Sequence, residues 1–331
     1  AGSRFVCRDH GHTSAPGHSH IFHARTMSQR SALLTKLLEW GSCCVADDGP
    51  DERPIAVSSQ QSLWFQLPEG LEGQVAGLDV CNEDQAALGN ASLGLEDRGT
   101  VELEGGATYT GQWLGEHRHG QGVVVRPDGG RYDGQFREDR AHGAGRFVHA
   151  NGDMYDGEWV EDRAHGRGKF LHQDGSSYEG EWCHDTKSGN GFETWVDGSQ
   201  FKGEYNAGKK HGFGVFTSGD GSTFAGQFVD DGMNGEGTYT FADGRTYQGQ
   251  WQQSQMSGRG QMKWPDGRCY EGAYADDRKQ GEGKFSWPDG RSYEGQWLGG
   301  KQHGIGTYLD QKGRARKGEW NEGHRMRWLD T

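Results

Sequence analysis

The sequence has few cysteines and no long hydrophobic run, and each absence excludes a class of protein. Its six cysteines include no C-x-x-C pair and follow no common spacing, which argues against a disulfide framework or a zinc site and favours reduced thiols. No stretch reaches the roughly 18 apolar residues needed to cross a bilayer. No apolar segment of a signal peptide is evident either. We therefore expect a cytoplasmic protein.

Basic residues are scarce relative to acidic ones. The chain carries 35 Lys and Arg against 48 Asp and Glu, a net charge of −13. Nucleic-acid binding needs a basic surface, so no nucleic-acid partner is expected. The same balance weakens any broad attraction to anionic lipid. Hydrophobic residues make up only 31% of the chain, which is low for a closed globular core and suits an elongated assembly.

Glycine, in contrast, is abundant at 58 residues, and it is part of a repeated pattern. The pattern aromatic-x-Gly-x-aromatic returns every 23 residues without insertion or deletion. It begins at Tyr109, Tyr132, Tyr155, Tyr178, Phe201, Phe224, Tyr247, Tyr270 and Tyr293. A further copy at 316–320 keeps the phase but lacks its first aromatic residue. A period this constant identifies a repeat protein, in which each unit stacks on the next.

Each unit reads as two strands. The stretch 155–159 alternates with period two, placing Tyr155 and Trp159 on one face, with a gap at Gly157 into which a neighbouring ring can lie. Asp174-Gly175 predicts a two-residue hairpin turn with positive φ at both positions. The resulting fold class is all-β: an elongated, single-layer antiparallel sheet of about nine 23-residue hairpin repeats, roughly 85 Å long at about 4.8 Å per strand. A mostly irregular N-terminal region with one short helix precedes it.

The aromatic residues of the repeats would line one face of this sheet, as a partner surface or as packing. They are Tyr109, Trp113, Tyr132, Phe136, Tyr155, Trp159, Tyr178, Trp182, Phe201, Tyr205, Phe224, Phe228, Tyr247, Trp251, Tyr270, Tyr274, Tyr293 and Trp297. Exposed aromatic rows on a single-layer sheet favour pairing with a second array, as a homodimer, or with another chain. The opposite face would carry solvated carboxylates such as Glu179 and Glu181.

The motifs Tyr-x-Gly-x-Trp, His-Gly-x-Gly and Asp-Gly at this period resemble the MORN repeat (membrane occupation and recognition nexus). The resemblance covers residues from about 100 to 320. It implies an elongated single-layer β-sheet and roles at junctions between membranes and the cytoskeleton, such as ciliary or cortical sites. Two departures stand out: Glu193 replaces an apolar residue of a second strand, and the last unit is basic, as expected for a polar cap.

The chain before the repeats divides by composition. We expect a disordered His-rich tail (1–26), a short amphipathic helix with a cysteine pair (27–44), a linker or capping region (45–99) and the repeat array with its C-terminal cap (100–331). Within the second segment, residues 31–40 have an apolar stripe of leucines, and Cys43 and Cys44 follow at once. This pattern is compatible with S-acylation of Cys43 and Cys44 and with membrane association through residues 31–44. The alternative is a helix that packs on the first repeats, with unmodified thiols.

No motif predicts catalysis, a bound metal or a cofactor. The stretch Gly203 to Lys210 resembles a phosphate-binding loop but lacks the Ser or Thr that holds the metal. The repeated histidines (His119, His142, His165, His211 and His303) give way to Ser, Asn or Gln in the other four complete units. A role in closing a loop is therefore expected for them, and the chain is not expected to be an enzyme.

The sequence thus favours a non-catalytic scaffold that binds protein partners and lies peripheral to a membrane or the cytoskeleton. Two alternatives stay open. The array could be the regulatory part of a larger enzyme, such as a phosphatidylinositol-phosphate kinase or a lysine methyltransferase. It could also bind phospholipid directly through its repeats, although its acidic balance argues against this.

Overall fold

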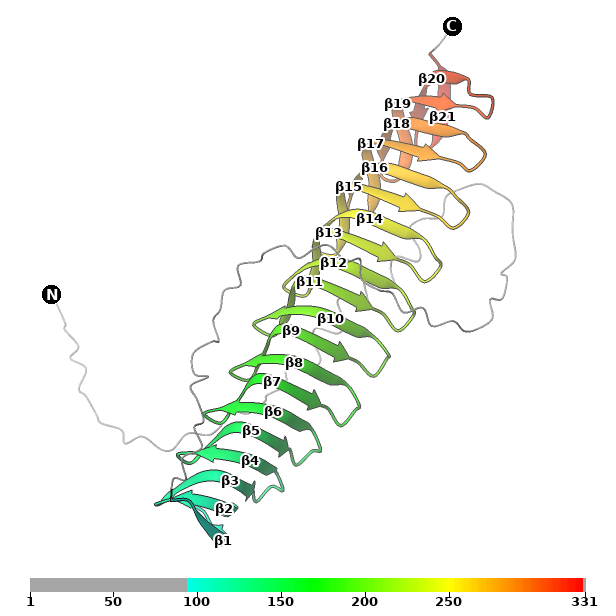
Figure 1. Cartoon of the computed structure of the whole chain (residues 1–331). Coiled ribbons are helices and arrows are strands. Elements are labelled where there is room, and N and C mark those ends of the chain that lie inside the picture. Colours follow the sequence, from blue (N-terminus) through cyan, green and yellow to red (C-terminus); the bar gives the residue numbers. More distant parts are fainter. Residues whose placement is uncertain (1–93, 330–331) are drawn as a thin grey trace, which may run out of the picture.

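The computed structural model describes residues 94–329, which form one open β-sheet of 21 strands. Each strand pairs antiparallel with the strand before it and the strand after it, so the sheet is a simple meander. Figure 1 shows hairpins stacked one after another into a long ribbon, with β1 at one end and the C-terminus at the other. At about 4.8 Å per strand, 21 strands extend for roughly 95 Å. The predicted all-β, single-layer fold is confirmed.

Each repeat contributes one strand of seven residues and one of nine. The strands are β1 (Glu96–Glu102), β2 (Thr108–Leu114), β3 (His117–Val125), β4 (Arg131–Arg137), β5 (Arg140–Val148), β6 (Met154–Val160), β7 (Arg163–Leu171), β8 (Ser177–Cys183), β9 (Thr186–Thr194), β10 (Gln200–Asn206), β11 (Lys209–Thr217), β12 (Thr223–Val229), β13 (Gly232–Thr240), β14 (Thr246–Gln252), β15 (Gln255–Lys263), β16 (Cys269–Ala275), β17 (Arg278–Ser286), β18 (Ser292–Leu298), β19 (Lys301–Leu309), β20 (Ala315–Asn321) and β21 (His324–Trp328). No helix long and apolar enough to cross a membrane occurs in this part of the chain.

The predicted tail, the predicted helix with Cys43 and Cys44, and most of the 45–99 region lie outside the described residues. The sheet itself begins at Glu96, four residues before the predicted start of the repeat array at residue 100. At its far end, the guanidinium carbons of Arg316 and Arg325 lie 4.0 and 4.3 Å from the ring centroid of Trp328. These cation–π contacts hold two guanidinium groups of the basic last unit against the ring of Trp328.

The two ends of each hairpin use different connections. Within a repeat, only Glu161 and Asp162 join β6 to β7, and their φ angles of +49° and +67° suit a two-residue type I′ turn. Between repeats, five residues join β7 to β8, and of these only Gly175 has a positive φ, +88°. The prediction of a two-residue turn at Asp174-Gly175 is therefore wrong. The tight turn lies at the other end of the strands, because aspartate tolerates the left-handed backbone there.

Successive two-residue turns are fastened to one another. The backbone N–H of Ala164 donates to Oδ1 of Asp185, 2.8 Å away, and the N–H of Asp185 donates to the carbonyl of Ala164 at 3.0 Å. Asp162 makes the same two bonds with Ala141. The second turn residue thus clamps each repeat to the preceding one, a role that was not predicted from the sequence.

Each hairpin also bends at the glycines in its middle. Gly157 of β6 lies opposite Gly168 of β7, and the register shifts before Glu158 pairs with His165. This bulge places two extra residues, Gly166 and Arg167, in β7 opposite β6. Bulges bend and twist the strands, and the strands are visibly curved in Figure 1. His165 therefore lies within β7, at the bulge, which corrects its predicted place in a loop. The equivalent His119, His142, His211 and His303 lie in β3, β5, β11 and β19.

Candidate functional site

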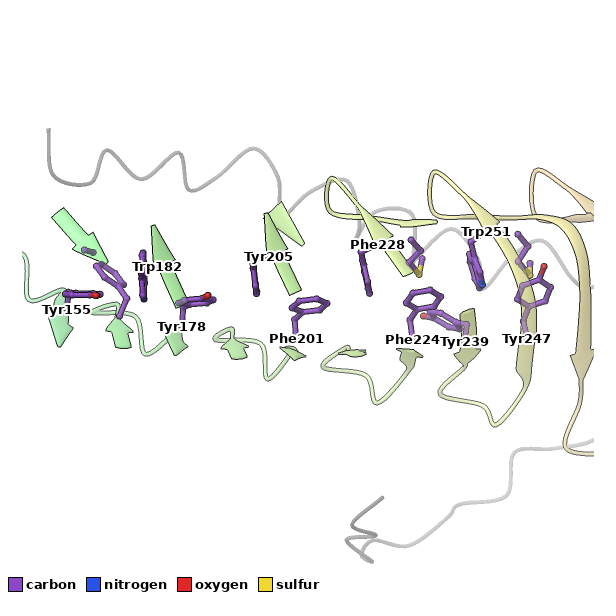
Figure 2. Close-up of a cluster of buried hydrophobic side chains, with 14 of the residues drawn as sticks. Tyr155, Tyr178, Trp182, Phe201, Tyr205, Phe224, Phe228, Tyr239, Tyr247 and Trp251 are labelled. Carbon is purple, nitrogen blue, oxygen red and sulfur yellow. The ribbon is translucent and has the colours of Figure 1, made fainter. Parts of the chain in front are cut away.

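The structure gathers all the predicted aromatic residues of the repeats into one continuous core, in which each side chain is only 0–6% exposed. The ring of Tyr155 meets those of Trp159 and Trp182 edge to face, with centroids 5.0 and 5.3 Å apart. Figure 2 shows the two rows, with Tyr178 and Phe201 in one and Trp182 and Tyr205 in the other. Of the two roles left open for these residues, the structure shows packing.

The expectation of exposed aromatic rows is therefore wrong, and the argument for pairing with a second array through them falls with it. The physical reason is the bend at the glycines. An alanine Cβ at Gly168 or Gly180 would overlap Tyr155 or Tyr178, so each tyrosine ring lies directly over the glycines of its own hairpin. The gap left by glycine is filled by the tyrosine of the same hairpin.

Most polar atoms of these rings bond to the backbone. The hydroxyl of Tyr155 donates to the carbonyl of Glu158 at 3.0 Å, and the indole Nε1 of Trp159 donates to the carbonyl of Gly145 at 2.8 Å. Burial raises the pKa of Tyr109 and Tyr293 to about 12. These hydroxyls hold their protons far above neutral pH and act as structural donors.

The opposite face is polar, but part of it is structural. Oε1 of Glu181 accepts the backbone N–H of Asn190 at 3.0 Å, and Oε1 of Glu158 accepts that of Arg167 at 3.1 Å. Glutamine serves the same purpose in other repeats, where Oε1 of Gln112 accepts the N–H of Gln121. Glu181 was predicted to be simply solvated. It instead satisfies a donor at the bulge.

On the polar face, the paired glycines of successive strands form a row without side chains, and the residues before and after each glycine lie on either side of it. We call this row of glycines the glycine furrow. Over β13–β18 the row is hollowed and encloses about 730 Å³, with Gly260, Gly272 and Gly283 among the residues that line the hollow. The charged residues around this hollow are Glu236, Arg259, Glu271, Glu282, Lys284 and Glu294.

Two phenylalanines interrupt the polar face near the middle of the array. Phe192 is 41% exposed and Phe213 is 54% exposed. Phe213 stands where later repeats carry Glu236, Arg259 and Glu282, and Phe192 stands where the two repeats that line the hollow carry Gln261 and Lys284. Neither residue was predicted from the sequence. An alignment of the repeats at their 23-residue period shows that most repeats carry polar side chains at these two positions, with Val123, Val215 and Ile305 among the exceptions.

On the other face of the sheet, behind Phe192 and Phe213, the core contains charged side chains. Oε1 of Glu193 lies 2.5 Å from Nζ of Lys187, and Oε2 accepts a hydrogen bond of 2.7 Å from the hydroxyl of Tyr205. Nζ of Lys210 lies 3.8 Å from Oδ1 of Asp231, and burial lowers the pKa of this lysine. Glu193, the departure noted in the sequence, is therefore paired within the core.

Two parts of the described structure resemble ligand sites, but we assign a ligand to neither. Gly203 to Lys210 runs from β10 through a two-residue turn into β11, without the helix that a phosphate-binding loop precedes. In the described part of the chain, His165, Cys183 and His184 bring potential metal-ligating atoms within 4.8 Å of one another. Cys183 already takes part in another interaction. Because its side chain is engaged, we do not assign a metal to this group.

The repeat unit seen in the structure coincides with a known sequence family. The family model of the MORN repeat matches nine consecutive segments, at residues 109–131, 132–154, 155–177, 178–200, 201–223, 224–244, 247–267, 270–290 and 293–313. This chain belongs to the MORN repeat family. The resemblance drawn from the motifs is thus confirmed, and in every matched segment of the MORN array the first strand carries the core aromatics.

Two solved structures show a weak likeness to the MORN array. The TCP10 domain of Danio rerio CPAP, in complex with a peptide of Danio rerio STIL, is 12% identical; the match covers 70% of this chain and 98% of that one, with a TM-score of 0.39. The SAS-4 TCP domain of Drosophila melanogaster, in complex with a proline-rich motif of Ana2, is 10% identical, with coverage of 52% and 86% and a TM-score of 0.30. Scores this low carry no information about function. A search of curated proteins found no match.

Proposed function

We propose that this MORN array is a non-catalytic scaffold that binds an extended segment of a partner protein along its glycine furrow. The exposed pair Phe192 and Phe213 carries this proposal, because large apolar rings at 41% and 54% exposure are costly on a polar face unless something covers them. The aromatic rows, which looked like the partner surface in the sequence, are filled by their own packing. The polar face is therefore the face available to a partner.

The strand register places the two rings on either side of the furrow. Phe192 and Val215 both pair with Lys202, so they lie one strand to either side of it. Phe213 precedes Gly214, and Gly214 pairs with Gly203. A side chain of the partner that rests on these glycines would lie between the two phenylalanines. A few clustered aromatic residues of this kind commonly supply most of the binding energy of an interface.

The backbone beneath this site is held from the other side of the sheet. Glu193 follows Phe192 directly and points into the core, where Lys187 and Tyr205 bond its carboxylate. Oε1 of Glu204 accepts the backbone N–H of Phe213 at 3.1 Å. Both phenylalanines therefore stand on backbone fixed by hydrogen bonds, which lowers the conformational cost of binding.

The furrow is tested by proximity labelling with the full chain in its native cell. The variant Phe192→Ser/Phe213→Ser is compared with Val196→Ser/Val229→Ser, which removes two exposed valines (61% and 45%) outside the furrow. We expect the phenylalanine variant to lose a subset of labelled neighbours by about 10-fold, the effect of about 1.4 kcal/mol, while the valine variant keeps them. Identical neighbours for wild type and the phenylalanine variant would refute the proposal.

We further propose that the scaffold acts on the cytoplasmic side of a junction between a membrane and the cytoskeleton. The resemblance to MORN-repeat proteins at such junctions supports this, and so does the leucine stripe of residues 31–40 beside Cys43 and Cys44. Labelled palmitate should enter the wild-type protein and fail to enter Cys43→Ser/Cys44→Ser. Equal incorporation into both proteins, or none into either, would contradict an acyl anchor at these cysteines.

A further inference from the structure

The sheet of the MORN array is open, so it has two edges. Among the described residues β1 pairs only with β2, and β21 pairs only with β20. An edge strand presents a row of backbone N–H and C=O groups that can pair with another strand. Proteins commonly protect both edges with charge, and here the two edges carry charge of opposite sign.

The N-terminal edge is acidic. Residues 94–104 contain four carboxylates, those of Glu96, Asp97, Glu102 and Glu104, against the single guanidinium of Arg98. Arg98 is also occupied, because its Nη2 donates to the carbonyl of Gly115 at 2.8 Å and its guanidinium carbon lies 5.0 Å from the ring centroid of Trp113. The acidic side chains of β1 are exposed.

The C-terminal edge is basic. Residues 312–328 contain six Lys and Arg side chains against two carboxylates. Arg325 and Arg327 belong to β21 itself and are exposed, as is His324. Apolar side chains are exposed at both edges as well: Leu95 and Val101 are 38% and 37% exposed, and Met326 is 63% exposed.

Strand direction decides which contacts between copies suit these charges. Strands alternate in direction along the meander, so β1 and β21 run the same way. A two-fold contact would place β1 against β1 or β21 against β21, with like charges opposed. If the second copy is instead shifted along the long axis of the array without rotation, the basic β21 of one copy lies beside the acidic β1 of the next. The aromatic cores of the two copies then lie on the same face.

We propose that copies of this chain associate end to end, through parallel pairing of β21 of one copy with β1 of the next. Such a contact joins two different surfaces and does not close, so it extends into an open row of arrays. The interface is a strand pair with a few apolar contacts, which belongs to the small and weak class. Association should therefore rise with concentration and fall with salt, because exposed charges are screened.

A charge swap tests this contact. The head variant Asp97→Lys/Glu102→Lys makes strand β1 basic, like β21, and the tail variant Arg325→Glu/Arg327→Glu makes strand β21 acidic, like β1. In sedimentation at low salt, we expect the average mass of the wild type to rise at least 2-fold with concentration and to return to the monomer value in about 1 M salt. Each variant alone should stay monomeric. An equimolar mixture of the two should associate again, because each edge then meets an edge of opposite charge.

Several outcomes would overturn the proposal. A wild type that stays monomeric throughout the low-salt series does so, and so does a head variant that associates as well as the wild type. The head variant decides the matter even if the tail variant loses β21, because Asp97 and Glu102 are exposed and form no ion pair among the described residues. The test is independent of the furrow, since Phe192→Ser/Phe213→Ser should associate like the wild type.

Discussion

The hydroxyl of Tyr205 donates a hydrogen bond of 2.7 Å to the carboxylate of Glu193, which joins two successive repeats inside an otherwise aromatic core. Nζ of Lys187 lies 2.5 Å from the other carboxylate oxygen and 4.8 Å from the ring centroid of Tyr178. The carboxylate thus has two partners. Its removal would leave the Lys187 ammonium and the Tyr205 hydroxyl without this partner in a half-buried place.

Removing this carboxylate alone should therefore be costly. Glu193→Ala should lower the free energy of unfolding by about 1–3 kcal/mol, the penalty for leaving buried polar groups without partners. The triple variant Lys187→Met/Glu193→Phe/Tyr205→Phe installs residues found at the equivalent positions of other repeats, such as Met256, Phe285 and Phe228. It should be neutral or stabilising, because an apolar set of similar size avoids the cost of burying charge and leaves no hydroxyl without its acceptor. Denaturant unfolding measures both, and an equal loss in the two variants would contradict the account.

The paired glycines should be intolerant of any side chain for steric reasons. Gly168 has an ordinary backbone, but a Cβ there would overlap the hydroxyl and ring carbons of Tyr155. Gly168→Ala should destabilise the array by about 1–3 kcal/mol, the usual cost of overpacking, and raise hydrogen exchange in β6 and β7. Gly99→Ala in β1 is the matched control, because a Cβ at Gly99 meets nothing within 4 Å. Similar losses for the two variants would show that steric overlap is not the cause.

The turn clamp predicts a difference between two substitutions at one residue. Asp185→Ala removes the acceptor of the Ala164 N–H, so exchange of that amide should quicken about 10-fold or more, which corresponds to about 1.4 kcal/mol. Burial raises the pKa of Asp185, although the Ala164 N–H partly offsets this, so the charge itself is unfavourable here. Asp185→Asn keeps an acceptor and tolerates the positive φ of +66°. It should exchange like the wild type, and a loss equal to that of alanine would disprove the clamp.

The buried tyrosines predict a loss of stability in alkali. Burial raises the pKa of Tyr109 and Tyr293 to about 12, whereas a tyrosine in the unfolded chain titrates near about 10. Between those values the folded state binds more protons than the unfolded state, so the free energy of unfolding falls as pH rises through that window. Unfolding curves from about pH 8 to about pH 11, with tyrosinate absorbance in parallel, measure this. Ionisation of these tyrosines near pH 10 in an intact array would refute it.

Much of the fold follows from the sequence alone. The constant 23-residue period fixes the number of units, and the period-two pattern around Gly157 fixes strands with aromatics on one face. Both signals are local, because a strand's alternation and a repeat's length are written in consecutive residues. The basic cap after Tyr308 also follows from the same phase.

Only the tertiary structure decided which face is open. The register shift between Gly157 and Glu158 depends on hydrogen bonds to a second strand, and it bends the sheet until each tyrosine covers its own glycines. That bend buries the aromatic rows and leaves Phe192 and Phe213 exposed beside the furrow. The partners of Glu193 come from its own strand and from the next repeat. A sequence pattern gives the face on which a side chain lies, whereas pairing between strands decides what covers it.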